Sequence, residues 1–93
     1  MTIYSEEILT TGASPVQLTP AKYNVPGGAK AERAVIVVKT NPIFYGFLTT
    51  PTALSGYKAS TDAVITIDGY DNIKNFRAVA QGSAGTIYIN YFS

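Results

Sequence analysis

Hydrophobic and polar residues alternate along most of this chain in short runs, which Gly, Pro, Asn and Asp separate. Thr, Val, Ile, Tyr and Phe dominate within the runs. Alternation with a period of two, interrupted by turn residues, is typical of β-strands, and helix-like apolar spacing is nearly absent. The pattern predicts strands at Tyr4–Thr10, Val16–Thr19, Lys22–Val25, Glu32–Thr40, Ile43–Leu48, Asp62–Asp68, Asn75–Gln81 and Thr86–Phe92.

Seven or eight antiparallel strands in 93 residues predict one all-β domain over residues 1–93, folded as a small antiparallel β-sandwich. Eight strands favour a double-sheet jelly roll and seven an Ig-like Greek key; we favour the jelly roll. A polar loop is expected to reach about Ser60, and a turn is expected at Gly69–Asp71. Ile73 breaks the alternation, which predicts a bulge near Lys74. Residues 1–9 are interpreted either as a first strand or as an N-terminal arm lying on a neighbour.

The longest run carries apolar residues on both faces. Ala34, Ile36 and Val38 share one face, and Val35 and Val37 share the other with charged neighbours. Isolated exposed valines are common on protein surfaces. The alternative is that this second face packs on another layer or on a neighbouring subunit, and the sequence leaves both interpretations open.

Composition excludes several classes of function. The chain has no Cys and no His, so disulfides, thiolate metal sites and His-based catalytic triads are excluded. Seven Lys and Arg residues are spread evenly against six acidic ones, which argues against a nucleic-acid partner. The longest aliphatic run, Ala34–Val38, is too short to cross a membrane. We therefore expect no enzyme, metal site, cofactor, nucleic-acid partner or membrane partner.

The carboxylates support the same expectation. Glu6 and Glu7 are adjacent in a predicted strand, so they point to opposite faces and are expected to be solvated edge charges. The run Asp68–Asn72 holds several oxygen ligands, but Asp and Asn are also ordinary turn residues, and the spacing of an EF-hand is absent. An enzyme based on Asp62, Asp68 or Asp71 would need a cleft that a thin sandwich hardly offers.

Aromatic residues are the remaining candidates for a site. Tyr57, Tyr70 and Tyr88 are expected to face solvent, where they can anchor a protein interface or stack on a sugar ring. For Tyr88 an interface, a structural role and a glycan contact all stay open. Phe44, Phe47 and Phe76 are expected to fill the core.

Three stretches, in this order and spacing, resemble small structural proteins of tailed bacteriophages. Val25–Ala29 and the aliphatic strand after it resemble a "VPAGA" turn, and Pro51–Gly56 is similar to a "PTAS-G" loop. Ile73–Ala80 with Gly85–Tyr91 resembles a closing "IxxFRA…G-A-LxVxYF" hairpin. Together they cover residues 16–92. Relatives carry a charged run where this chain has Tyr45–Leu48, which suggests a more buried strand that contacts another subunit.

The resemblance implies a virion component, and a capsid decoration (cement) protein fits best. Such a protein is made in the host bacterial cytoplasm and binds the outside of the shell formed by the major capsid protein, often as a homotrimer. A tail, neck or baseplate component is the alternative in the same class, and a carbohydrate-binding module is the alternative in another class. The residues expected at a partner interface are Tyr4, Ile8, Val35, Val37, Tyr45, Phe47 and Tyr88.

Overall fold

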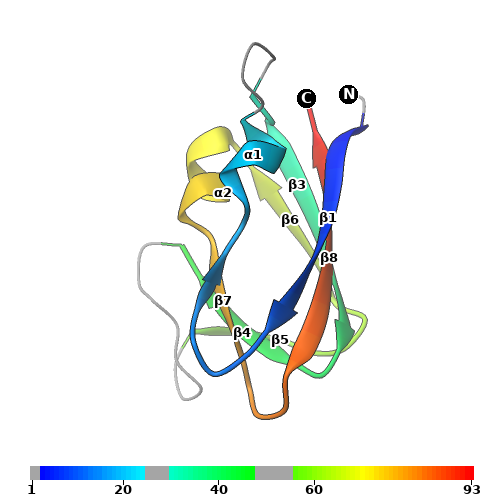
Figure 1. Ribbon diagram of the computed structural model, residues 1–93, viewed down its shortest axis with the longest axis vertical. Helices are drawn as coiled ribbons and strands as arrows, with labels where there is room; N and C mark the ends of the chain where they lie inside the picture. Colours follow the sequence, from blue (N-terminus) through cyan, green and yellow to red (C-terminus); the bar gives the residue numbers. More distant parts are fainter. Residues whose placement is uncertain (1–2, 25–29, 48–55) are drawn as a thin grey trace.

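A computed structural model describes residues 3–24, 30–47 and 56–93 as two antiparallel four-stranded sheets (Figure 1). The first sheet has the order β1 (Ile3–Thr11), β8 (Gly85–Phe92), β3 (Arg33–Thr40) and β6 (Val64–Asp68). The second has the order β2 (Val16–Gln17), β7 (Arg77–Ala80), β4 (Ile43–Gly46) and β5 (Tyr57–Ala59). The predicted all-β fold is confirmed.

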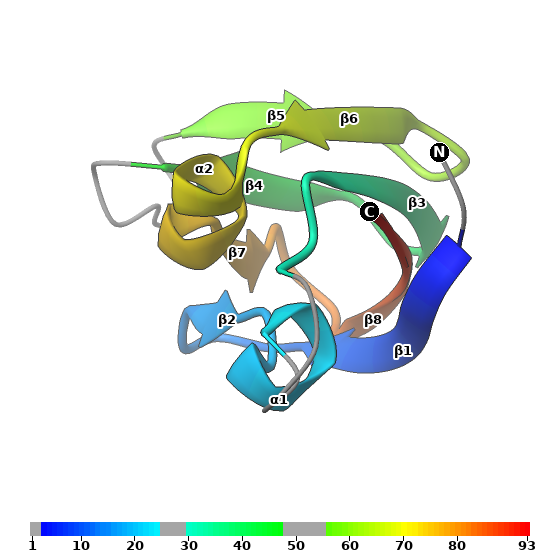
Figure 2. The same ribbon diagram turned by 90° about the horizontal axis from the view of Figure 1, so that it is seen from above.

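The strand order is that of a jelly roll. Strand β1 pairs with β8, β2 with β7, β3 with β6 and β4 with β5, as in one long antiparallel hairpin. The hairpin is rolled up so that β8 also pairs with β3, and β7 with β4. Seen from above, the strands surround a single core (Figure 2). Eight strands in two sheets of this order are the double-sheet jelly roll that we favoured from the sequence.

The core lies between the inner faces of the two sheets. Period-two alternation directs Ala34, Ile36 and Val38 of β3 inward, where all three are fully buried. The neighbouring strand β8 adds Ile87, Ile89 and Tyr91 at matching positions. Burial of each large apolar side chain contributes about 1.5–3 kcal/mol to the free energy of unfolding, so the sandwich is stable without disulfide bonds.

One of the predicted strands is wrong. Lys22 and Tyr23, expected in a strand, belong to the short helix α1 (Pro20–Tyr23). Pro20 occupies the start of the helix, where its missing N–H costs no hydrogen bond. Asn24 makes an isolated bridge with Lys30, and Val25 lies outside the described residues.

The expected turn and bulge around residues 69–75 are a second helix, α2 (Tyr70–Asn75). Gly69 precedes it with φ of 96°, a conformation that glycine adopts without strain. Ile73 is fully buried and belongs to this helix. It breaks the strand alternation because its position follows helical spacing. Both helices lie toward the end of the sandwich at which the chain termini lie (Figure 1).

Two further expectations about the second sheet need correction. The expected loop before Ser60 contains the short edge strand β5. Phe76 is fully buried and Phe47 packs partly against the core, as expected. Phe44, however, is outside the core: alternation turns it to the outer face, opposite Val79 and Lys58.

Within the described residues, neither helix has the length or apolar character needed to span a membrane.

Candidate interaction surface

Four apolar side chains form a continuous row across the outer face of the first sheet. Ile8 of β1 is directly opposite Tyr88 of β8, Tyr88 is opposite Val37 of β3, and Val37 is opposite Val64 of β6. Ile8, Tyr88 and Val64 are 62%, 42% and 63% exposed. We call these four residues the apolar stripe. Since neighbouring strands are about 4.8 Å apart, the stripe spans about 14 Å.

The stripe exists because each strand directs its other face into the core. Val37 lies between the buried Ile36 and Val38, and Tyr88 between the buried Ile87 and Ile89. A scattered exposed valine needs no explanation. A row that crosses every strand of the sheet is contiguous apolar surface, which is typical of an interaction site.

Polar groups border the stripe on both sides. Glu6, Asn90, Val35 and Thr66 form the next row, in which only Val35 is apolar. On the other side, the Nζ atom of Lys39 lies 5.8 Å from the centre of the Tyr88 ring. A depression of about 420 Å³ lies between β1 and β8 and is lined by residues of both faces: Glu6, Glu7, Ile8, Tyr88, Ile89 and Asn90. An apolar centre with a polar border is the usual arrangement of a protein–protein interface.

The structure brings together four of the seven residues expected at an interface. Ile8, Val35, Val37 and Tyr88 share the outer face of the first sheet. Tyr4 lies in β1, but its side chain is outside the described residues. Tyr45 and Phe47 lie elsewhere and are half-buried, with ring centres 5.7 and 5.8 Å from the ring of Phe76. These contacts give the two residues a packing role at the second sheet.

The three candidate surface tyrosines lie on three separate elements. Tyr57 of β5 is 66% exposed and Tyr88 of β8 is 42% exposed, as expected. Tyr70 of α2 is half-buried, with its ring 5.8 Å from that of Tyr23 and under the ammonium of Lys30. The expectation that Tyr70 faces solvent is therefore only partly correct, and the three rings form no common platform.

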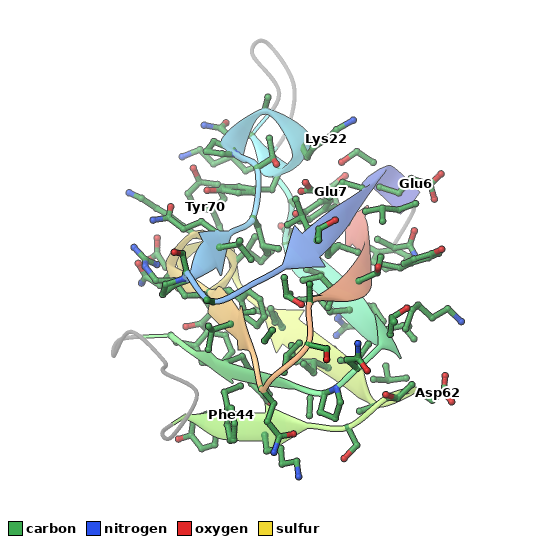
Figure 3. The ribbon with its side chains drawn as sticks, turned by 60° about the horizontal axis from the view of Figure 1, so that its bottom comes forward. Glu6, Glu7, Lys22, Phe44, Asp62 and Tyr70 are labelled. Carbon is green, nitrogen blue, oxygen red and sulfur yellow. The ribbon has the colours of Figure 1, made fainter. Side chains whose placement is uncertain are left out.

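Glu7 is a polar anchor that the sequence interpretation missed. Its Oε2 accepts hydrogen bonds from the Tyr91 hydroxyl at 2.5 Å and from the Thr19 N–H at 3.2 Å. Its Oε1 accepts a third, from the Thr19 hydroxyl at 2.6 Å. Figure 3 shows Glu6 and Glu7 pointing to opposite sides of β1. The expected solvated charge is correct for Glu6, which is exposed, and wrong for Glu7, which is half-buried.

The Glu7 hydrogen bonds fix β1 to two parts of the fold. One partner belongs to β8 and the other to the segment before α1, so the first strand is attached at its inner face as well as by its ladder. Ser5 adds a bond from its hydroxyl to the Lys22 carbonyl of α1. In this structure residues 3–9 lie within strand β1 of the first sheet. The signal was present in the sequence, since Glu7 alternates with Ser5 and Leu9 on one face.

Burial raises the pKa of Tyr91 well above its usual range, and the hydrogen bond to Glu7 raises it further. The folded protein therefore holds Tyr91 neutral at pH values at which the unfolded chain ionises it. The contribution of neutral Tyr91 to the free energy of unfolding is fully present below about pH 10, the pKa of a free tyrosine. This contribution is lost as the pH rises above that value. We expect the urea midpoint to fall above pH 10, and the fall to be smaller in Tyr91→Phe. Equal pH profiles for the two proteins would contradict this role for Tyr91.

In the described part of the chain, the acidic residues are not arranged as a metal-binding site. No three acidic side chains there come together as a metal site would need. Asp68, the last residue of β6, accepts a 2.6 Å hydrogen bond from Arg33, the first residue of β3, and the two form an exposed ion pair. Asn72 donates to the Asp68 carbonyl, so the Asp68–Asn72 segment is arranged as the start of a helix.

No protein-family model, curated protein or solved structure matches this chain.

Proposed function

We propose that this chain is a structural protein of a tailed-phage virion, and specifically a capsid decoration protein. In this role it binds the outside of the shell formed by the major capsid protein and stabilises it. The supporting observation is the apolar stripe, which crosses a whole sheet and is 42–63% exposed at Ile8, Tyr88 and Val64. A subunit that is buried against neighbours in a particle accounts for such a surface.

Three other features support the proposal. The jelly roll is an architecture found among viral capsid domains. Charged residues make up only 14% of the chain, which suits a subunit that buries much of its surface. The phage-like motifs cover residues 16–92, although Val25–Ala29 and Pro51–Ser55 of those motifs lie outside the described residues. None of these features requires a catalytic group.

A virion offers two kinds of neighbour for the outer face of the first sheet. One is the major capsid protein, and the other is a further copy of this chain in a homo-oligomer, for which the resemblance favours a trimer. Both would be met at the capsid surface after synthesis in the host cytoplasm. A tail, neck or baseplate component is the alternative within the same class.

Copy number distinguishes a decoration protein from a tail component. We expect quantitative mass spectrometry of purified particles to find this chain at a copy number comparable with that of the major capsid protein. The tail, neck or baseplate alternative predicts far fewer copies, at the level of known tail proteins in the same particles. Absence from purified particles would overturn both assignments.

A further inference from the structure

We propose that a second copy of this chain covers the apolar stripe, in a two-fold pair whose axis runs parallel to the strands. The proposed function allows two neighbours for the outer face of the first sheet, the major capsid protein and a further copy of this chain, and the pair assigns the stripe to the further copy. The pairing is a property of the free protein, so it does not depend on the assignment to a virion.

The shape of the stripe favours a second copy. Its two bulky members, Ile8 and Tyr88, lie on the adjacent strands β1 and β8, and its two valines lie on β3 and β6. Rotation about an axis parallel to the strands places β1 over β6 of the second copy, and β8 over its β3. Ile8 then meets Val64 of the second copy, and Tyr88 meets its Val37. Large side chains opposite small ones are what close packing between two layers requires.

The row next to the stripe is compatible with the same arrangement. Glu6 comes opposite Thr66 of the second copy, and Asn90 opposite its Val35, because the rows keep their level along the strands. Arg33 and Asp68 are already paired within one copy. These pairs oppose no like charges, whereas the arrangement brings the two Lys39 side chains, on the strands next to the axis, to the same interface. A two-fold axis along the stripe would instead place Ile8 on Ile8 and Tyr88 on Tyr88.

The size of the face predicts a weak pair. Four strands about 4.8 Å apart and eight residues of about 3.4 Å give a face of roughly 500 Å² per copy. The total of roughly 1,000 Å² is at the lower limit for a specific interface. An interface of this size is typical of a weak or transient pair. A two-fold pair uses the same patch on both copies, whereas the trimer favoured by the resemblance would join two different patches.

Cysteine cross-linking tests the register, since the chain has no cysteine of its own. Ile8→Cys and Val64→Cys are prepared separately, reduced, and then mixed under mild oxidation at high micromolar concentration. We expect a disulfide-linked heterodimer in the mixture, and much slower linking in either variant alone. Both positions are more than 60% exposed, so the variants are expected to fold normally.

A matched pair and a mass measurement complete the test. Gln17→Cys, at an exposed position of the second sheet, is mixed with Val64→Cys and is expected to link no faster than random collision. Sedimentation equilibrium of the unmodified protein is expected to show monomer and dimer. Preferential Ile8–Ile8 linking, a trimeric mass, or a monomer at high micromolar concentration would each overturn the pairing. None of these results would by itself contradict particle binding, which the copy number tests.

Discussion

Replacing Gly85 by alanine is expected to lower the free energy of unfolding by about 3 kcal/mol, at the upper end of the range for overpacking. A Cβ atom on Gly85 would lie 1.9 Å from the carbonyl oxygen of Thr40, a backbone atom that cannot rotate away. Gly85 begins β8 beside the end of β3, and its N–H donates to the Thr11 hydroxyl at 3.2 Å. The substitution would push apart three strands of the first sheet. Urea unfolding followed by circular dichroism measures the change.

Gly82→Ala is the matched control. It is in the same β7–β8 connection, but a Cβ atom there meets nothing within 4 Å. The control is expected to change the free energy of unfolding by less than about 0.5 kcal/mol, as surface substitutions usually do. Equal stabilities for the two variants would show that β3 and β8 do not approach each other as closely as described.

Removing the carboxylate of Glu7 is expected to have the second large effect on the free energy of unfolding. Glu7→Ala is expected to cost about 2 kcal/mol, because the buried hydroxyl of Tyr91 and the Thr19 groups lose their acceptor. The strand β1 would lose its attachment to the segment before α1. Hydrogen exchange of β1 amides is therefore expected to accelerate more than that of β3 amides. The free energy of unfolding and the exchange rates are measured on the same protein.

Glu6→Ala separates this effect from a change in net charge. The neighbouring residue has the same charge but points to the outer face and is exposed. Its removal is expected to leave the free energy of unfolding within about 0.5 kcal/mol of the parent value. If Glu6→Ala and Glu7→Ala destabilise equally, the inner hydrogen bonds of Glu7 do not hold β1.

Alternation predicted the sandwich because each long strand has one buried face. Period two alone places Ala34, Ile36 and Val38 on one face of their strand, and all three are fully buried. The helices α1 and α2 were not predicted because they have only four and six residues, too few to display a helical period. Strand β5 has three residues and alternates too briefly to be recognised.

The candidate surface was predictable in its members but not in their arrangement. Period two shows that Val35 and Val37 share a face, and it gives Tyr88 and Ile8 an outward position in their own strands. It does not show that β8 lies between β1 and β3, since these strands are far apart in the sequence. The row from Ile8 to Val64 appears only when the register of three strand pairs is known. Val64, which completes the row, was not among the residues expected at an interface for this reason.

Polar contacts between distant segments were the least predictable part. The partners of Glu7 come from the segment before α1 and from β8, and no local pattern connects them. A carboxylate at an inward position of an alternating strand is nevertheless a visible signal. A charged group is buried in that way only where hydrogen bonds compensate for the lost water.

The most direct test of the assembly surface compares particle occupancy with stability in Val37→Asp. Val37 lies in the middle of the stripe on an outer face, so an added charge is expected to cost no more than about 1 kcal/mol of unfolding free energy. Occupancy on purified capsids, measured by co-sedimentation, is expected to fall at least about ten-fold, since burying an unpaired charge costs more than about 1.4 kcal/mol. Gln17→Asp, on the second sheet, is expected to bind as the parent does. Undiminished occupancy of a folded Val37→Asp protein would contradict the assignment of this face to assembly.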